Sequence, residues 1–261
     1  MNRLIILGLV VTFLTSCSEY EKLLKSDDVQ LKYDKAFEYY EDKQYVKSAT
    51  LLQYLIPIYK ATDKAAKVEF FYAKSLYGQK DYILAGYHFG EFAKNFGNSK
   101  YTEEAVFMHA YCFYLHSPRP TLDQDYTYKA IEAFTMFQIK FPDSEKITES
   151  KEILTELNNK LAKKAYINSK LYFDLGYYKS SIVTLRNTIN DYPNSKFREE
   201  LMFMLLKSNY LLAENSIASK QKERYQNTVD EYYSFIDEFP ESEFSKEAVK
   251  IYNNSMSELN N

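Results

Sequence analysis

Tyr192-Pro193-Asn194-Ser195 is the stretch that decides the fold, because the chain contains three more stretches of the same form. These are Phe96-Gly97-Asn98-Ser99, Phe141-Pro142-Asp143-Ser144 and Phe239-Pro240-Glu241-Ser242, and the four aromatic residues are 45, 51 and 47 residues apart. Proline cannot continue a helix and disfavours helical geometry in the residue before it, while serine is a preferred helix N-cap. Each stretch therefore predicts the end of one helix and the start of the next.

A second pattern lies between these stretches and is built around Tyr45, Tyr82 and Tyr178. Each tyrosine follows a short turn, with a small residue nine positions before it, a small residue three after it and a large apolar residue seven after it. The residues three and seven positions after the tyrosine share one helix face, and small side chains there and in the preceding helix let two antiparallel helices approach closely. The nine predicted core positions are Ala36, Ser48, Leu52, Ala73, Ala85, Phe89, Ser169, Ser181 and Leu185.

Together the two patterns are typical of tetratricopeptide (TPR) repeats, which consist of two helices and a turn. The chain has only 6 Gly and 6 Pro, as an all-α chain with tight turns would. We expect an α-solenoid of about five TPR-like repeats wound into a right-handed superhelix, with a non-repeating helical bundle as the alternative. The expected repeats span 30–60, 63–97, 100–142, 164–193 and 196–240, followed by a closing helix at 242–259.

Three segments depart from the regular repeat. Residues 117–124 insert two prolines between the helices of the third repeat, and residues 213–226 form a charged insert in the fifth. Residues 146–162 predict either an extra helix or an extension of the first helix of the fourth repeat.

The N-terminus has the form of a bacterial lipoprotein signal. Arg3 provides the positive charge, 4–14 form an apolar run of about 11 residues, and Leu14-Thr15-Ser16-Cys17 ends it. That run is too short to span a bilayer, which needs about 20 residues. We expect a signal peptide at 1–16, lipidation of Cys17, a lipidated linker at 17–29 and the solenoid domain at 30–261. The alternative is an ordinary cleaved signal followed by an incidental cysteine.

Composition limits the function classes. The formal net charge is −3 and the pI about 5.8, so no basic surface favours nucleic acid as a partner. Only Cys112 remains once Cys17 is lipidated, so no disulfide is expected.

The 26 Tyr and 18 Phe residues suggest a binding surface. In TPR-like repeats the first helix of each pair lines the concave face, where extended peptides bind. Counting from Ala36, Ala73 and Ala110 places nine residues on that face, eight of them aromatic. They are Tyr33, Phe37, Tyr40, Phe70, Lys74, Tyr77, Phe107, Tyr111 and Tyr114. We expect about half of them to line a peptide groove and the others to pack between repeats.

No motif indicates catalysis. The sequence has no nucleophile elbow, phosphate loop or His-Glu-x-x-His motif, and its paired carboxylates fit solvated helix faces. His109, Cys112 and His116 share a helix face and could offer three ligands to a metal, but no second cluster completes the shell. We expect no enzyme activity, no metal and no cofactor.

The lipobox cysteine, the lead Tyr20-Glu21-Lys22-Leu23-Leu24-Lys25-Ser26 and the five aromatic-turn repeats together resemble the BamD (YfiO) family. This family comprises lipoprotein subunits of the outer-membrane β-barrel assembly (BAM) complex. The resemblance implies a periplasm-facing outer-membrane lipoprotein that promotes the folding and insertion of barrel proteins. Its implied partners are a POTRA domain of the BamA-like barrel subunit, unfolded outer-membrane proteins and, through acylated Cys17, the outer-membrane lipid.

The resemblance also divides these partners along the chain. It implies that the N-terminal repeats bind substrate and the C-terminal repeats bind the barrel subunit, with Arg198 nearest to a family arginine that contacts that subunit. Two rival functions remain open. One is a solute- or glycan-binding surface lipoprotein partnering an outer-membrane importer, although such sugar platforms favour Trp, which is absent here. The other is a cell-wall lytic enzyme, for which the repeats leave no catalytic domain.

Overall fold

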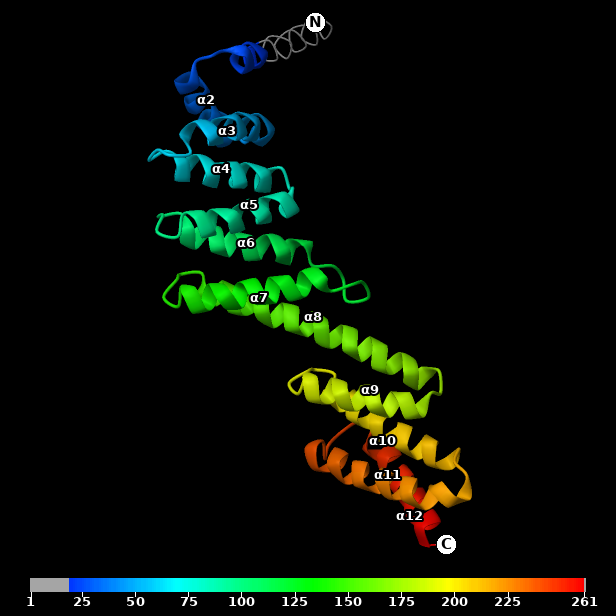
Figure 1. The fold of residues 1–261 in the computed structure, drawn as a ribbon. Helices are drawn as coiled ribbons and strands as arrows, with labels where there is room; N and C mark the ends of the chain where they lie inside the picture. Colours follow the sequence, from blue (N-terminus) through cyan, green and yellow to red (C-terminus); the bar gives the residue numbers. More distant parts are fainter. Residues whose placement is uncertain (1–18, 261) are drawn as a thin grey trace, which may run out of the picture. The chain divides into compact units, whose positions relative to one another are not determined.

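The computed structural model describes residues 19–260, and every regular element in that range is an α-helix (Figure 1). The helices form pairs joined by short turns, which confirms the all-α fold of five TPR-like repeats. The pairs are α2 (Val29–Glu41) with α3 (Tyr45–Tyr59), α4 (Ala65–Gly78) with α5 (Tyr82–Asn95), α6 (Thr102–His116) with α7 (Asp125–Lys140), α8 (Ile147–Asp174) with α9 (Tyr178–Asp191), and α10 (Arg198–Glu214) with α11 (Ala218–Glu238), followed by α12 (Ser245–Asn260). The handedness of the superhelix stays a prediction.

The described residues form two compact units. The first unit comprises 19–117 and 125–154, and the second comprises 118–124 and 155–260. Helix α8 contributes 147–154 to the first unit and 155–174 to the second. Within the first unit each helix from α2 to α7 packs against the next, and within the second unit α9 to α12 do the same.

The nine core positions predicted from the tyrosine pattern are all buried. Two of the small residues also make an inter-repeat hydrogen bond. Ser48 Oγ on α3 lies 3.0 Å from Ser75 Oγ on α4, and Ser181 Oγ on α9 lies 3.1 Å from Ser208 Oγ on α10. Each pair satisfies buried hydroxyl groups without a larger side chain, so the helices can pack closely.

The turns within the pairs share one backbone geometry. The residue two positions before each tyrosine is left-handed, with φ of 60° at Lys43, 65° at Lys80 and 74° at Gly176. Gly78, just before one of these turns, has a different role. A Cβ at Gly78 would lie 2.5 Å from the ring of Tyr45, so the absent side chain makes room for that ring.

The serines of the aromatic-Pro turns do not cap the following helices directly, as the sequence predicted. The serine hydroxyl accepts a hydrogen bond from the backbone N–H two residues on, at 3.1 Å for Ser144, 3.2 Å for Ser195 and 3.0 Å for Ser242. The helices begin three residues after the serine, at Ile147, Arg198 and Ser245. The serine therefore caps the short turn that leads into the helix, not the helix itself.

Two of the three irregular segments belong to longer helices, and the third is a loop. Residues 147–162 are not a separate helix but belong to the 28-residue α8. The charged insert at 213–226 mainly lengthens its repeat, because α10 runs to Glu214 and α11 begins at Ala218. The 117–124 insert is a loop that closes on itself, with Gln124 Nε2 donating to the carbonyls of Arg119 and Leu122 at 3.0 and 2.9 Å.

The expected linker contains a helical turn that packs against the first repeat. Residues 19–25 are helical, and Leu23 is buried in the core of the first unit. Lys32 on α2 is only 3% exposed. Its Nζ donates to the Leu24 carbonyl at 3.0 Å and lies 3.9 Å from the centre of the Tyr54 ring. This lysine therefore joins the N-terminal turn to α2 and α3.

None of the helices in residues 19–260 is both long and apolar enough to cross a membrane.

Candidate functional site

Two of the nine predicted groove residues belong to the core instead. Phe70 is 1% exposed and Phe107 is 2% exposed. Phe70 stacks on Tyr101 at 4.6 Å and contacts Phe89 and Phe92 of α5, and Phe107 packs against Phe134 and Phe137 of α7. Both lie three residues before the small residue of their helix. In α4 and α6 that position faces the second helix of the same repeat, so these rings are buried there.

The first unit presents a cluster of half-buried rings on α2 and α4. Phe37 lies 4.8 Å from Tyr33 and 5.2 Å from Phe71, and Tyr40 lies 4.9 Å from Phe71, measured between ring centres. Phe71 was not among the predicted residues, although the adjacent Phe70-Phe71 pair in the sequence was a signal that one ring of the two faces outward. We call Tyr33, Phe37, Tyr40 and Phe71 the aromatic face.

Two lysines of α4 give the aromatic face a positive charge. Lys67 Nζ lies 4.1 Å from the centre of the Phe37 ring and 6.0 Å from that of Phe71. Lys74 follows Phe71 on α4, and its Nζ lies 6.0 Å from the centre of the same ring. A cation over an aromatic ring is attracted by the negative face of that ring. The face therefore combines apolar contact area with two ammonium groups.

Lys74 connects the first helices of three repeats. It forms an ion pair of 2.8 Å with Glu104 on α6 and interacts electrostatically with the hydroxyl of Tyr40 on α2. Burial alone would lower the pKa of Lys74, but the hydrogen bond to Glu104 and the interaction with Tyr40 outweigh it, so this pKa lies above its usual value. Burial raises the pKa of Tyr40, and Lys74 reverses this only in part. At neutral pH Lys74 is charged and Tyr40 keeps its proton.

The remaining predicted groove residues are three tyrosines on α4 and α6. Tyr77 on α4 packs against Tyr82 at 5.4 Å, and Tyr111 on α6 lies 5.5 Å from Tyr114. Burial raises the pKa of Tyr77, and Tyr111 raises it further. All three are half-buried, so each leaves part of its ring accessible. Such rings with polar tips can hold a polypeptide by apolar contact and by hydrogen bonds to its backbone.

Arg198, the predicted partner-binding residue, is already engaged within the second unit. Its Nε and Nη2 donate to the two carboxylate oxygens of Glu238, the latter at 2.9 Å, and its Nη1 donates to the Ile189 carbonyl at 3.2 Å. A two-pronged guanidinium–carboxylate pair has the best geometry available to surface charges. Arg198 thus connects the start of α10 to the ends of α9 and α11.

We expect Glu238→Gln to lower the stability of the second unit by less than about 1 kcal/mol, because the pair is partly exposed and screened. The Arg198 hydrogen bond holds the pKa of Glu238 below its usual value. The stabilisation is therefore present above the ordinary glutamate pKa and is lost as the pH falls through the lower folded value. Urea unfolding from pH 7 downward should show the wild-type advantage shrinking. Glu241→Gln, at an exposed site, is the control, and an equal loss in both variants would contradict the role given to the pair.

The candidate metal ligands are not brought together. His109 Nδ1 lies 2.7 Å from the Gly86 carbonyl, Cys112 is buried, and His116 packs edge-on against Tyr126. Burial raises the pKa of the Cys112 thiol to about 12, so it does not ionise near neutral pH. Residues 19–260 contain no group of three or more His, Cys, Asp or Glu side chains arranged to hold a metal ion. Cys17, the predicted lipidation site, lies outside the described residues.

The geometry defines a helical-repeat protein with a lysine-bearing aromatic face. Its sequence gives the family: the chain belongs to the outer membrane lipoprotein family YfiO, whose sequence profile matches residues 25–224. The chain is also 26% identical over 249 residues to the "Putative outer membrane protein assembly factor BamD" of Aquifex aeolicus, covering 93% of this chain and 78% of that protein. Membership of this family associates the chain with the outer membrane.

Solved structures of TPR proteins are more distant. The TPR2AB domain of yeast Sti1 in a complex with pHSP90 is 12% identical, with a TM-score of 0.40 over 87% of this chain and 98% of that one. The P58(IPK) TPR domain is 12% identical, with a TM-score of 0.41 over 92% and 68%. A TPR protein from Parabacteroides merdae is 12% identical, with a TM-score of 0.38 over 87% and 99%.

Proposed function

We propose that this chain is a non-enzymatic subunit of the β-barrel assembly machinery. In this proposal acylated Cys17 anchors it in the outer membrane, and its repeats face the periplasm. The first repeats bind unfolded outer-membrane proteins, and the second unit binds a POTRA domain of the barrel subunit. Membership of the YfiO family and the similarity to an assembly factor support this role.

The observation that carries the substrate proposal is the aromatic face with Lys67 and Lys74. Strands of outer-membrane barrels alternate apolar and polar residues and have aromatic residues at both membrane interfaces. Half-buried rings can accept the apolar side chains of such a strand in many registers. Lys67 favours an acidic or carboxylate group on the same segment, whereas Lys74 is already paired with Glu104. We expect modest affinity, because an unfolded segment loses chain entropy when it binds.

We expect the combined change of Tyr40, Tyr77 and Tyr114 to alanine to weaken binding of a strand-like peptide by at least about thirtyfold, since aromatic residues are frequent interface hot spots. The probe is a fluorescently labelled peptide of alternating apolar and polar residues that ends in phenylalanine, and anisotropy measures its binding. The matched control changes three exposed tyrosines, Tyr128, Tyr177 and Tyr233, to alanine. Equal binding by both triple variants would contradict the proposed site, and circular dichroism checks that each variant is folded.

The complex is tested by affinity purification from gently solubilised outer membranes, with a tag at the C-terminus of the chain. Recovery of a large β-barrel subunit with POTRA domains would support the assembly role. Recovery of a nutrient importer would instead favour solute or glycan capture.

Arg198→Ala and Glu238→Gln then separate two roles of the arginine, the internal ion pair and direct contact with the partner. Both break the internal ion pair, but only Arg198→Ala removes the guanidinium, so a loss of partner binding confined to Arg198→Ala supports direct contact.

A further inference from the structure

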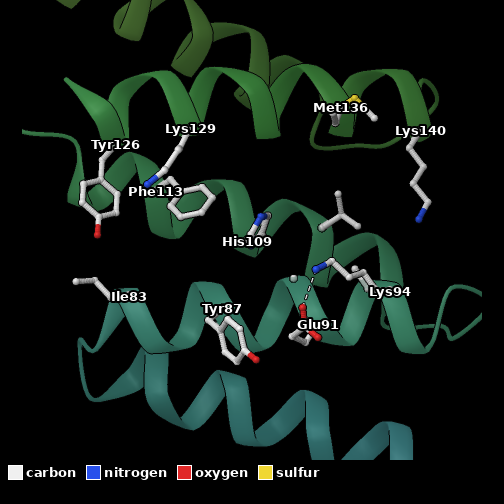
Figure 2. Close-up of a pocket in the computed structure, with 13 residues that line it drawn as sticks. Ile83, Tyr87, Glu91, Lys94, His109, Phe113, Tyr126, Lys129, Met136 and Lys140 are labelled. Carbon is white, nitrogen blue, oxygen red and sulfur yellow. Dashed lines mark hydrogen bonds and ion pairs between the residues drawn. The ribbon is translucent and has the colours of Figure 1, made fainter.

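A second surface of the first unit has no part in the proposed function. A groove with a cavity volume of about 630 Å³ lies between α5 and α7, with α6 as its floor (Figure 2). Its lining is mainly apolar and includes Ile83 and Tyr87 of α5, Val106 and Phe113 of α6, and Tyr126 and Met136 of α7. Ile83, Tyr87 and Met136 are more than half exposed, so the groove opens to solvent along its length.

Two glycines of α5 shape the floor of this groove. The His109 ring packs against Gly90, where a Cβ would lie 2.9 Å from the ring, and its Nδ1 lies 2.7 Å from the Gly86 carbonyl. A Cβ at Gly86 would lie 3.0 Å from the Cβ of Cys112. Burial lowers the pKa of His109, so its ring is neutral at physiological pH. The floor is therefore uncharged, and α6 packs closely against α5.

Helix α6 is apolar on the side that faces this groove. Val106, His109 and Phe113 lie at i, i+3 and i+7 and are only half-buried. The corresponding positions of α4, counted from Ala73, hold Glu69, Tyr72 and Leu76, of which Tyr72 and Leu76 are buried by the chain itself. A helix that is apolar all round normally has a covering on every side. In the third repeat, residues 19–260 leave this side of α6 partly uncovered.

The rim of the groove carries three lysines and two carboxylates. Lys94, Lys129 and Lys140 line it together with Glu91, and Glu132 lines the adjoining hollow over the same α6 residues. Lys94 pairs with Glu91 at 2.7 Å and Lys129 with Asp125 at 2.6 Å, while Lys140 has no carboxylate within ion-pair distance among the described residues. Figure 2 shows Lys94 and Lys140 near the same end of the groove, on opposite walls. Because Lys94 is already paired with Glu91, an occupant with a negative charge at that end would complement Lys140.

We propose that this groove binds an amphipathic helix of a partner protein, with its apolar stripe on α6 and an acidic residue toward Lys140. The groove extends along α5 from Ile83 to Lys94, which corresponds to about 16 Å or three turns of helix. Its volume suits a few large side chains in an i, i+3, i+4, i+7 stripe. Because the groove is open along its length, one side of the occupant stays in water. A helix with a polar face suits this exposure, whereas an apolar acyl chain does not.

The test uses a synthetic helical peptide with leucine at i, i+3, i+4 and i+7, glutamate on both flanks and alanine elsewhere. A second peptide has lysine in place of every glutamate, and labelled-peptide anisotropy measures binding to the full chain. We expect the glutamate peptide to bind at least about threefold more tightly than the lysine peptide. Met136→Asp places a carboxylate on the apolar contact and should weaken binding about tenfold or more.

Ile139→Asp is the matched control, because Ile139 is on the same helix, is 68% exposed and does not line the groove. Equal binding of the two peptides, no binding at millimolar concentration, or the same loss in both variants would overturn the proposal. If palmitate displaces the peptide, the groove would be assigned to an acyl chain instead. Dimerisation in sedimentation experiments that Met136→Asp abolishes would assign it to a second copy of this chain.

Discussion

Replacing Cys17 by alanine is expected to move the chain from the membrane fraction to the soluble fraction. Each buried CH₂ of an acyl chain contributes about 0.8 kcal/mol, so two or three chains hold a protein on a bilayer almost irreversibly. The helices of residues 19–260 offer no membrane span to replace that anchor. The release should therefore be nearly complete, and immunoblots of fractionated cells after a carbonate wash, which removes protein-mediated attachment, measure it.

Cys112→Ala is the matched control, because it removes the other cysteine of the chain. That thiol is buried in the first unit, and burial raises its pKa to about 12, so it is not available for modification. The Cys112→Ala variant should stay in the membrane fraction. A Cys17→Ala variant that remains membrane-bound after the wash would show that the lipobox prediction is wrong.

The helical turn next to the predicted lipid anchor packs against the first repeat. Only Ser18 separates Cys17 from the helical residues 19–25, whose Leu23 is buried in the core. The sequence-based expectation of a linker missed this packing, because a short run of leucines and lysines fits a flexible lead equally well. The buried Lys32 was equally hard to foresee, since lysine is among the residues least often buried unless it is paired.

Repeat architecture was predictable because it depends on local chemistry. Proline and the turn serines fix where helices end, and the spacing of small residues such as Ala73 fixes which face packs. The lengths of α8 and α11 were less predictable, because continuous runs of helix formers contain no stop signal. The environment of Arg198 depends on Glu238, 40 residues away, and no local pattern in the sequence reports that pairing.

The assignment of rings to core or surface was the least predictable feature. Phe70 and Phe71 are adjacent and chemically identical, and on a helix they point about 100° apart. Counting from Ala73 chose Phe70 for the groove, whereas the structure buries Phe70 and places Phe71 on the aromatic face. The count assumed that the same offset faces the same way in every repeat. Tyr33, at the same offset in α2, is half-buried, which shows that the assumption fails between repeats.

Phe70→Ala is therefore expected to destabilise the first unit by about 3–5 kcal/mol, the range for removing a fully buried phenylalanine. The ring contacts Phe89, Phe92 and Tyr101, so its loss leaves a cavity bounded by side chains of α5 and of the turn before α6. Phe71→Ala, at the adjacent half-buried position, should cost clearly less stability. It should instead weaken binding of the strand-like peptide, because Phe71 connects Phe37 and Tyr40 on the aromatic face.

Both variants can be made in the soluble Cys17→Ala background, which leaves Cys112 as the single thiol. Cys112 is buried in the first unit, so its reaction rate with a thiol reagent at increasing urea concentration reports the unfolding of that unit alone. Phe70→Ala should expose the thiol at a much lower urea concentration than Phe71→Ala does. Equal urea midpoints, or a larger loss of peptide binding than of stability in Phe70→Ala, would place the Phe70 ring in the groove after all.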